Sequence, residues 1–234
     1  MADETWPRNY SYNVYGKTKA VSEELVIQTK EKDIRNCIIR IPHLFGPSDY
    51  LIDATIAMPV IIGSKKDNNN ILNAKDKDPY SFIYIENAAN VFIVAARALA
   101  SSETSGQVNG EVFHVKSRDE NFIHFYRYTL NEQKSLFTLK IPFHVILFFA
   151  YIYELFVLFC FKFFGLQFGD PVQCFGVLAV ESCSQEYTFN DVKAQKILKN
   201  YNLVDDKEAI QRTRKWIALR NEVKYKKKMK KKTE

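Results

Sequence analysis

Glycine is scarce in this sequence, with eight residues among 234, about half of the average usage. The glycines stand at positions 16, 46, 63, 106, 110, 165, 169 and 176, and no three of them match the spacing G-x-G-x-x-G or G-x-x-x-x-G-K-[ST]. Turns of that kind let backbone N–H groups approach a phosphate. The sequence as given therefore contains no standard phosphate-binding loop.

Cysteine is also scarce, and its spacing excludes the common metal sites. The cysteines form no C-x-x-C pair and have no histidine at a distance suited to zinc; they are Cys37, Cys160, Cys174 and Cys183. We expect reduced thiols rather than disulfides, and no bound metal.

An excess of basic over acidic residues is absent from most of the chain. The formal net charge is +6, but the last eleven residues, Lys224 to Glu234, contain seven lysines and one glutamate, so the remainder has a net charge of zero. Nucleic-acid-binding domains carry basic residues over a folded face. The sequence therefore predicts no nucleic-acid partner, and its 47% hydrophobic content predicts a packed core.

Strands and helices alternate along the first half of the chain. β-branched and aromatic runs predict strands, and apolar residues at helical spacing predict helices. The expected strands are 37–41, 81–85 and 111–115, and the expected helices are 15–31, 87–99 and 121–132. This alternation predicts an α/β fold with a parallel sheet.

The stretch from Val145 to Phe161 breaks this pattern. It contains one charged residue, Glu154, and Pro142 precedes it. The stretch is apolar on all sides, unlike a surface helix, yet it is slightly shorter than the roughly 20 residues of a bilayer-spanning helix. Three readings stay open: a spanning helix, a helix or hairpin that enters one leaflet, and a buried core helix. The composition favours contact with a membrane.

Tyr15 and Lys19 are the sharpest local signal. They stand four residues apart in Y-G-K-T-K, so on a helix they project from the same face. An ammonium group beside a phenol favours the phenolate and lowers the phenol's pKa from its usual value of about 10. Such a tyrosine can take a proton from an alcohol as hydride leaves, and the lysine can donate to ribose hydroxyls. The pair is therefore a candidate for acid–base chemistry.

Five segments, in the same order along the chain, resemble the 3β-hydroxysteroid dehydrogenase/isomerase family of extended short-chain dehydrogenases. Y-G-K-T-K-A-V-S-E-E-L-V (Tyr15 to Val26) is similar to the active-site helix of that family, and E-T-W-P precedes it. C-I-I-R-I-P-H-L-F-G-P resembles the family's R-P-x-x-x-[YF]-G-P segment, with Ile41 between Arg40 and Pro42. The other similar segments are F-I-Y-I-E-N-A-A-N, G-E-V-F-H-V and the closing K-A-Q-K-I-L and A-I-Q-R-T-R-K-W.

The resemblance implies roles for four positions. Tyr15 would be the general acid/base, and Lys19 its electrostatic helper; both would bind the cofactor. Pro42 and His43 would lie beside the nicotinamide, and a local hydrogen bond is the alternative role of His43. The cofactor would be NAD or NADP, and the substrate a steroid or sterol whose 3β-hydroxyl is oxidised.

Several other polar residues are expected to have structural roles. Arg40 would pair with a nearby carboxylate, and Glu86 and Asn87 would cap a helix. After a short strand at 185–189, Asn190 would cap a helix that starts at Asp191, and a last helix would cover 206–222.

The resemblance also implies how the chain is organised. Residues 1–115 would be the C-terminal part of a Rossmann-like domain that binds NAD(P). Residues 116–222 would form a substrate-binding region with a membrane-associated segment at about 142–164, and 223–234 would be a disordered basic tail.

The family's glycine-rich turn and a catalytic Ser or Thr lie upstream of its tyrosine, whereas fourteen residues precede Tyr15 here. We therefore expect the sequence to be part of a longer enzyme, and we expect negligible dehydrogenase activity from these residues alone. The alternative is a catalytically inactive, membrane-associated protein that binds a sterol or a partner subunit.

The lysine-rich tail has two candidate functions. Lysines beside a membrane segment would favour an anionic cytoplasmic leaflet. Lys231 and Lys232, fourth and third from the last residue, are similar to the dilysine K-K-x-x signal that returns membrane proteins to the endoplasmic reticulum. We expect an endoplasmic reticulum membrane protein with a cytosolic tail. The particular steroid, isomerase or decarboxylating activity, and a homodimer stay open.

Overall fold

The computed structural model describes residues 1–6, 14–29, 34–49, 79–121, 125, 128–129, 143–166, 176–177 and 187–233. The chain forms two compact units whose segments alternate along the sequence. Unit 1 comprises Met1–Pro47, Ser81–Asp119 and Thr188–Glu234, and unit 2 comprises Ser48–Tyr80 and Glu120–Tyr187. This differs from the predicted division at residue 115, because the segment after Thr188 packs with the first two segments of unit 1.

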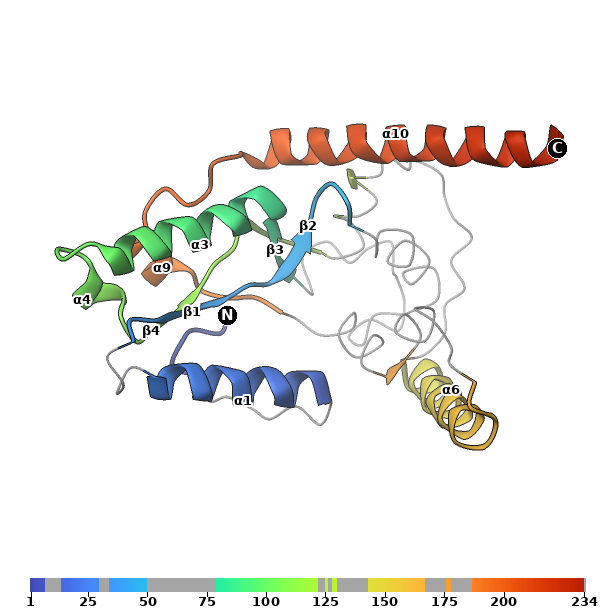
Figure 1. The fold of residues 1–234 in the computed structure, drawn as a ribbon, viewed down its shortest axis with the longest axis horizontal. Helices are drawn as coiled ribbons and strands as arrows, with labels where there is room; N and C mark the ends of the chain where they lie inside the picture. The colour runs from blue at the N-terminus through green and yellow to red at the C-terminus, as the bar shows by residue number, and fades with distance from the viewer. Residues whose placement is uncertain are drawn as a thin grey trace. The chain divides into compact units, whose positions relative to one another are not determined.

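The secondary structure alternates between helices and strands (Figure 1). The described helices are α1 (Val14–Gln28), α3 (Ile85–Ala100), α4 (Ser105–Val108), α6 (Phe143–Phe164), α9 (Val192–Ile197) and α10 (Asp206–Thr233). The described strands are β1 (Cys37–Arg40), β2 (His43–Phe45), β3 (Pro79–Tyr84), β4 (Glu111–His114) and β5 (Arg118–Asn121). The three predicted strands correspond to β1, β3 and β4.

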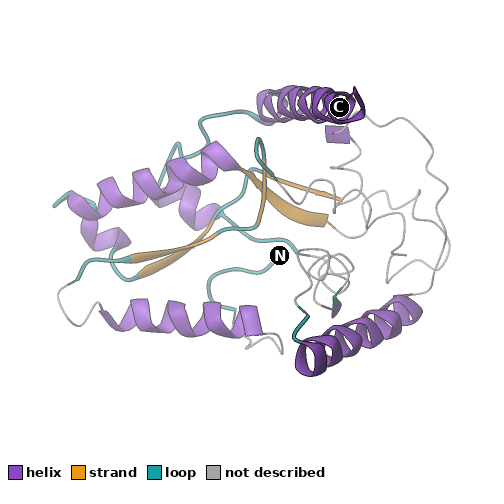
Figure 2. Ribbon diagram, turned by 45° about the vertical axis from the view of Figure 1, so that its right-hand side comes forward, coloured by secondary structure: helices purple, strands orange, loops and turns teal. Residues whose placement is uncertain are grey.

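The strands pair in two short sheets, shown in orange in Figure 2. β1 pairs with β4 in parallel, from Cys37 opposite Glu111 to Arg40 opposite His114. The second sheet has the order β2-β3-β5, and β2 is parallel to β3. The prediction of parallel strands is confirmed, and β1 is half-buried.

Helix α3 supplies much of the core of unit 1. Its buried apolar residues recur at helical spacing, at Ala88, Val91 and Ala95. They form one cluster with residues of two strands and of the segment that follows Thr188, including Ile83, Phe113, Leu198 and Tyr201. α1 lies on the side of the β1–β4 pair opposite to α3 (Figures 1 and 2).

Two predicted helix boundaries differ from the structure. The helix predicted for 121–132 begins later, because Asn121 is the last residue of β5; Phe125, Tyr128 and Thr129 are helical, and the rest of that range lies outside the described residues. The N-cap of α9 is Asp191 rather than the predicted Asn190, although the Oδ1 of Asn190 accepts from the backbone N of Val192 at 3.0 Å. α9 begins at Val192, one residue after the predicted start.

Helix α10 is longer than predicted and continues to Thr233. Its start at Asp206 agrees with the prediction, and Asp205 caps it by accepting from the backbone N of Lys207 and Glu208 at 2.8 and 3.0 Å. The sequence predicts disorder from residue 223 onwards, whereas the structure continues the helix there. Lysine is a good helix former, and extending a helix that has already formed needs no new nucleation.

Helix α6 covers the apolar stretch for which three readings were open. Most of its large apolar side chains are exposed; Phe148, Leu155 and Phe164 are each more than 60% exposed. Among the described residues, α6 is the one helix long and apolar enough to cross a membrane, and 17% of its apolar window is buried. This low burial disfavours the reading as a core helix.

Candidate active site

Tyr15 and Lys19 lie side by side on α1. The Lys19 Nζ is 5.5 Å from the centre of the Tyr15 ring, within the range of a cation–π contact. Tyr15 is 65% exposed, and Lys19 is also exposed. The predicted neighbourhood of the two side chains is confirmed. Both polar groups are accessible to a ligand, and a hydroxyl beside an ammonium suits the hydroxyls of a ribose.

Glu23 joins the same helix to strand β1. Arg40 makes a two-pronged contact with its carboxylate: Nη2 donates to Oε1 at 2.6 Å, and Nε donates to Oε2 at 3.0 Å. Both side chains are largely buried, with 22% of Arg40 and 13% of Glu23 exposed. Paired hydrogen bonds of this kind define the orientation of both groups. The predicted role of Arg40, as the partner of a carboxylate, is confirmed.

His114 is the second partner of Arg40. It stands opposite Arg40 in the β1–β4 ladder, and the Arg40 Nη1 lies 3.2 Å from its Nε2. A guanidinium can only donate, so Nε2 is the acceptor and the imidazole is neutral. Burial, and then the charge of Arg40, lower the pKa of His114, which favours this neutral form. The ring of Phe189 stacks on the imidazole at 4.7 Å.

Pro42 and His43 follow β1 after a single residue, Ile41. His43 is the first residue of β2 and pairs with Phe82 of β3. Its ring also meets that of Phe82 edge to face, with 5.6 Å between centres. Burial lowers the pKa of His43 to about 4, so this imidazole is neutral at neutral pH. Pro42 stands between the two strands.

The predicted capping role of Glu86 and Asn87 is wrong. α3 begins at Ile85, and its N-cap residue, Tyr84, makes no capping side-chain hydrogen bond. Glu86 instead accepts from Tyr84 Oη at 3.0 Å and from Arg212 of α10 at 2.5 Å. Asn87 is buried and bonds to the backbone of Leu203 and Val204. Arg212, Leu203 and Val204 lie more than 100 positions away along the chain, so local spacing carries no signal for these contacts.

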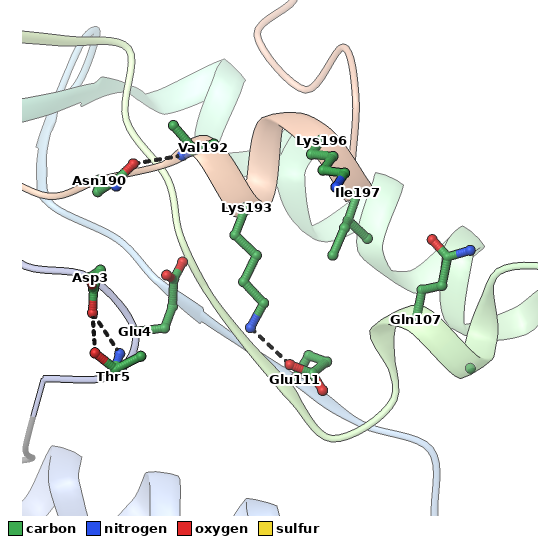
Figure 3. A pocket seen from close by; sticks show the side chains of 11 residues that line it. Asp3, Glu4, Thr5, Gln107, Glu111, Asn190, Val192, Lys193, Lys196 and Ile197 are labelled. Carbon is green, nitrogen blue, oxygen red and sulfur yellow. Dashed lines mark hydrogen bonds and ion pairs between the residues drawn. The ribbon is translucent and has the colours of Figure 1, made fainter.

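A hollow of about 690 Å³, most of whose lining residues are polar, opens elsewhere on unit 1 (Figure 3). It is lined by the N-terminal segment, α4, the start of β4 and α9. Several of its polar groups already form hydrogen bonds with one another. Lys193 Nζ donates to Glu111 Oε2 at 2.8 Å, and Asp3 accepts from Thr5. None of the four predicted site residues lines it, so it is separate from the candidate active site.

The described residues contain no cluster of three or more His, Cys, Asp or Glu side chains that could hold a metal ion. Cys37 and Cys160 are free thiols, and burial raises the pKa of Cys37. The other two cysteines lie outside the described residues.

Comparison with known proteins gives the family. The sequence model of the 3-beta hydroxysteroid dehydrogenase/isomerase family matches residues 1–136, more than half of the chain. A 3beta-hydroxysteroid-dehydrogenase/decarboxylase isoform 2 of Arabidopsis thaliana is 29% identical over 210 residues, which cover 85% of this chain and 34% of that protein. The sterol-4-alpha-carboxylate 3-dehydrogenase ERG26, decarboxylating, of Saccharomyces cerevisiae is 29% identical over 121 residues, which cover 49% of this chain and 32% of that protein.

The chain thus spans about a third of the length of these two relatives. Among solved structures, the Bordetella bronchiseptica enzyme WbmF in complex with NAD+ and UDP is similar with a TM-score of 0.51 and 12% identity, over 93% of this chain and 56% of that one. This likeness concerns the fold, and it confirms the predicted α/β, Rossmann-like architecture. The chain belongs to the 3-beta hydroxysteroid dehydrogenase/isomerase family.

Proposed function

We propose that the chain is part of an NAD(P)-dependent oxidoreductase that oxidises the 3β-hydroxyl of a steroid or sterol to a ketone. The observation that carries the proposal is the pair Tyr15–Lys19, side by side and exposed on α1. The family agrees with it, and the relatives from Arabidopsis and yeast are named as dehydrogenases of steroid or sterol substrates.

In this proposal Tyr15 takes the proton of the substrate hydroxyl. NAD(P)+, when bound, accepts the hydride from the carbon that carries this hydroxyl. The remaining electron pair of the O–H bond then completes the C=O bond of the ketone, so protons and electrons balance. Lys19 stabilises the negative charge on the Tyr15 oxygen before the proton arrives, and it donates to ribose hydroxyls.

Pro42 and His43 are proposed to lie beside the nicotinamide. Support comes from their place in the chain, one residue after the strand whose Arg40 binds Glu23 on the helix of Tyr15 and Lys19. A neutral His43 adds no charge that would oppose the positive nicotinamide ring, and its low pKa supports that state.

The catalytic assignment is tested in the complete protein by Tyr15→Phe, with formation of NAD(P)H followed during oxidation of a 3β-hydroxysterol. We expect turnover to fall by about 100-fold or more, because the proton acceptor is lost while the ring remains. Tyr187→Phe is the matched control, since Tyr187 is similarly exposed and contributes a ring stacked on Tyr80. Turnover of Tyr15→Phe within a few-fold of the wild type would reject the assignment. Substrates with and without a 4α-carboxylate would separate a simple from a decarboxylating dehydrogenase.

We also propose that the protein resides at the endoplasmic reticulum membrane with its tail in the cytosol. The exposed apolar side chains of α6 support membrane contact, and a sterol substrate partitions into a bilayer. Each lysine near an anionic membrane surface contributes about 1 kcal/mol to the free energy of membrane binding.

The proposed dilysine signal is tested by changing Lys231 and Lys232 to alanine. Changing Lys226 and Lys227 to alanine is the charge-matched control. We expect the first variant to leave the endoplasmic reticulum and the control to stay, as seen by microscopy of the tagged protein. Equal localisation of both variants would exclude a dilysine signal.

A homodimer is a further proposal about partners. It is supported by apolar side chains of α1 that are exposed in the single chain, Val21, Leu25 and Val26. Light scattering after size-exclusion chromatography would measure the mass, and Leu25→Asp should shift a dimer towards the monomer.

A further inference from the structure

Helix α1 has few apolar contacts that could set its position. From Tyr15 to Gln28, every side chain of α1 is exposed or half-buried. Leu25 is 59% exposed and Val21 43%. The hydrophobic effect is non-directional and scales with buried area, so such a helix is weakly held by packing. Polar contacts must therefore contribute more than usual to its orientation.

Glu23 lies on the side of α1 that carries Tyr15 and Lys19. The three residues are spaced by four positions, so each is rotated by about 40° from the previous one and lies about 6 Å further along the axis. A rotation of the helix about its axis therefore moves all three side chains together. Whatever fixes Glu23 also fixes the direction in which Tyr15 and Lys19 point.

Arg40 fixes Glu23 by two hydrogen bonds and is itself held by a third contact. Its Nε and Nη2 bind the two carboxylate oxygens, and its Nη1 reaches Nε2 of His114 on the neighbouring strand. His114 is in turn fixed: it is 3% exposed, its backbone N donates to Glu4, and Phe189 covers its ring. The guanidinium thus has one orientation, which the sheet determines.

Arg40 is also close in sequence to the second part of the candidate site. It is the last residue of β1, and only Ile41 separates it from Pro42 and His43. One residue therefore connects the helix of Tyr15 and Lys19 with the segment proposed to face the nicotinamide.

We propose that Arg40 is a positioning residue of the candidate active site, which sets the rotation of α1 through Glu23 and so aligns Tyr15 and Lys19 with the Pro42–His43 segment. This inference rests on the proposed function for the part that concerns turnover. The part that concerns the orientation of α1 is measured without any assay of turnover.

Arg40→Lys and Glu23→Gln are the variants that test the inference. Arg40→Lys keeps the positive charge but loses the planar fork and, with it, the simultaneous contacts to Glu23 and His114. Glu111→Gln is the matched control. It weakens another partly buried ion pair of the same sheet, Lys193–Glu111, which joins β4 to α9 instead of β1 to α1.

The first measurement is hydrogen exchange of backbone amides in the intact chain. In Arg40→Lys and Glu23→Gln we expect the amides of α1 to exchange about tenfold faster, and those of α3 to keep their wild-type rates. The double variant should loosen α1 no more than either single variant, because both remove the same interaction. Glu111→Gln should leave α1 unchanged.

The second measurement is the kinetics of sterol oxidation by the complete protein. A misaligned Tyr15 slows the chemical step, so kcat should fall about 10- to 100-fold in Arg40→Lys while KM for sterol changes less than threefold.

The outcomes test the positioning role of Arg40 and the proposed function separately. Wild-type α1 exchange in Arg40→Lys, or equal loosening of α1 and α3, would overturn the positioning role. A loosened α1 with an unchanged kcat would also overturn it. A wild-type protein without any turnover would reject the proposed function, while the exchange data would still decide whether Arg40 orients the helix.

Discussion

Asn87 and Val204 are 117 positions apart in the sequence, yet the side-chain amide of Asn87 binds both backbone groups of Val204. Its Oδ1 accepts from the Val204 N at 2.9 Å, and its Nδ2 donates to the Val204 O at 2.9 Å. The same Oδ1 accepts from the N of Leu203 at 2.9 Å. This buried amide thereby connects the segment before α10 to the first turn of α3.

Asn87→Leu is expected to destabilise the fold by about 2–4 kcal/mol. The substitution keeps the size of the side chain but leaves buried backbone groups of Leu203 and Val204 without partners. Chemical denaturation followed by circular dichroism measures the change. Asn90→Leu is the control: its Nδ2 makes one bond, to the Tyr201 O, so a loss of about 1 kcal/mol is expected. Equal losses in the two variants would contradict the special role of Asn87.

Gly46→Ala is expected to destabilise unit 1 by at least about 1–3 kcal/mol. Gly46 has φ of +147°, which residues with a Cβ rarely adopt, and an added Cβ would lie 2.6 Å from Cγ2 of Ile85. Gly106→Ala provides the contrast, because a Cβ there meets nothing within 4 Å and the residue lies in α4. Alanine should be neutral there or stabilise by up to about 1 kcal/mol. Thermal unfolding of both variants compares the two sites.

The stability of the protein should fall as the pH is lowered from about 6.5 to about 4, and His43 should cause part of this fall. Burial depresses its pKa to about 4, so in this window the unfolded chain binds a proton that the folded chain does not. Protonation of His43 lowers the free energy of unfolding by at most about 3 kcal/mol, and this full loss is reached below the folded-state pKa. His114, whose pKa is also lowered, should add to the fall.

Denaturation at several pH values, with His43→Asn against the wild type, tests this prediction. The variant should show a shallower slope of stability between about pH 6.5 and 4. His144→Asn is the control, because His144 is exposed on α6. An unchanged slope in His43→Asn would show that this imidazole does not titrate as expected.

Residues 224–233 should add helical signal to the protein, since α10 continues to Thr233. The difference in far-ultraviolet circular dichroism between the full chain and a chain that ends at Val223 measures this contribution. The signal should increase with salt, because screening weakens repulsion between lysines that are three and four positions apart. A difference spectrum typical of an unfolded chain would support the disordered tail that the sequence predicts.

Local patterns were sufficient for three of the described strands and for one part of the site. The runs 37–41, 81–85 and 111–115 correspond to β1, β3 and β4, because β-branched and aromatic residues favour strands. Tyr15 and Lys19 come together because residues four apart on a helix are neighbours, whatever the rest of the chain does.

Local patterns failed where a residue has both a local and a distant partner available. Asn87 stands in the first turn of α3 and resembles a cap, but its amide instead bonds to the segment before α10. The composition of unit 1 also depends on distant contacts. The residues after Thr188 return to unit 1, and packing against α3 and β4 cannot be read from sequence neighbours.

The sequence by itself determined the family, the α/β alternation and the adjacency of Tyr15 and Lys19, all of which depend on residue order and on contacts within one helix. Only the tertiary structure decided what holds that helix in place. Arg40 meets Glu23 and His114 across 17 and 74 positions of the chain. These contacts exist because the parallel register sets Arg40 opposite His114, and because α1 packs against β1 with Glu23 facing the strand. Register and packing angle depend on the whole fold, so no local spacing encodes them.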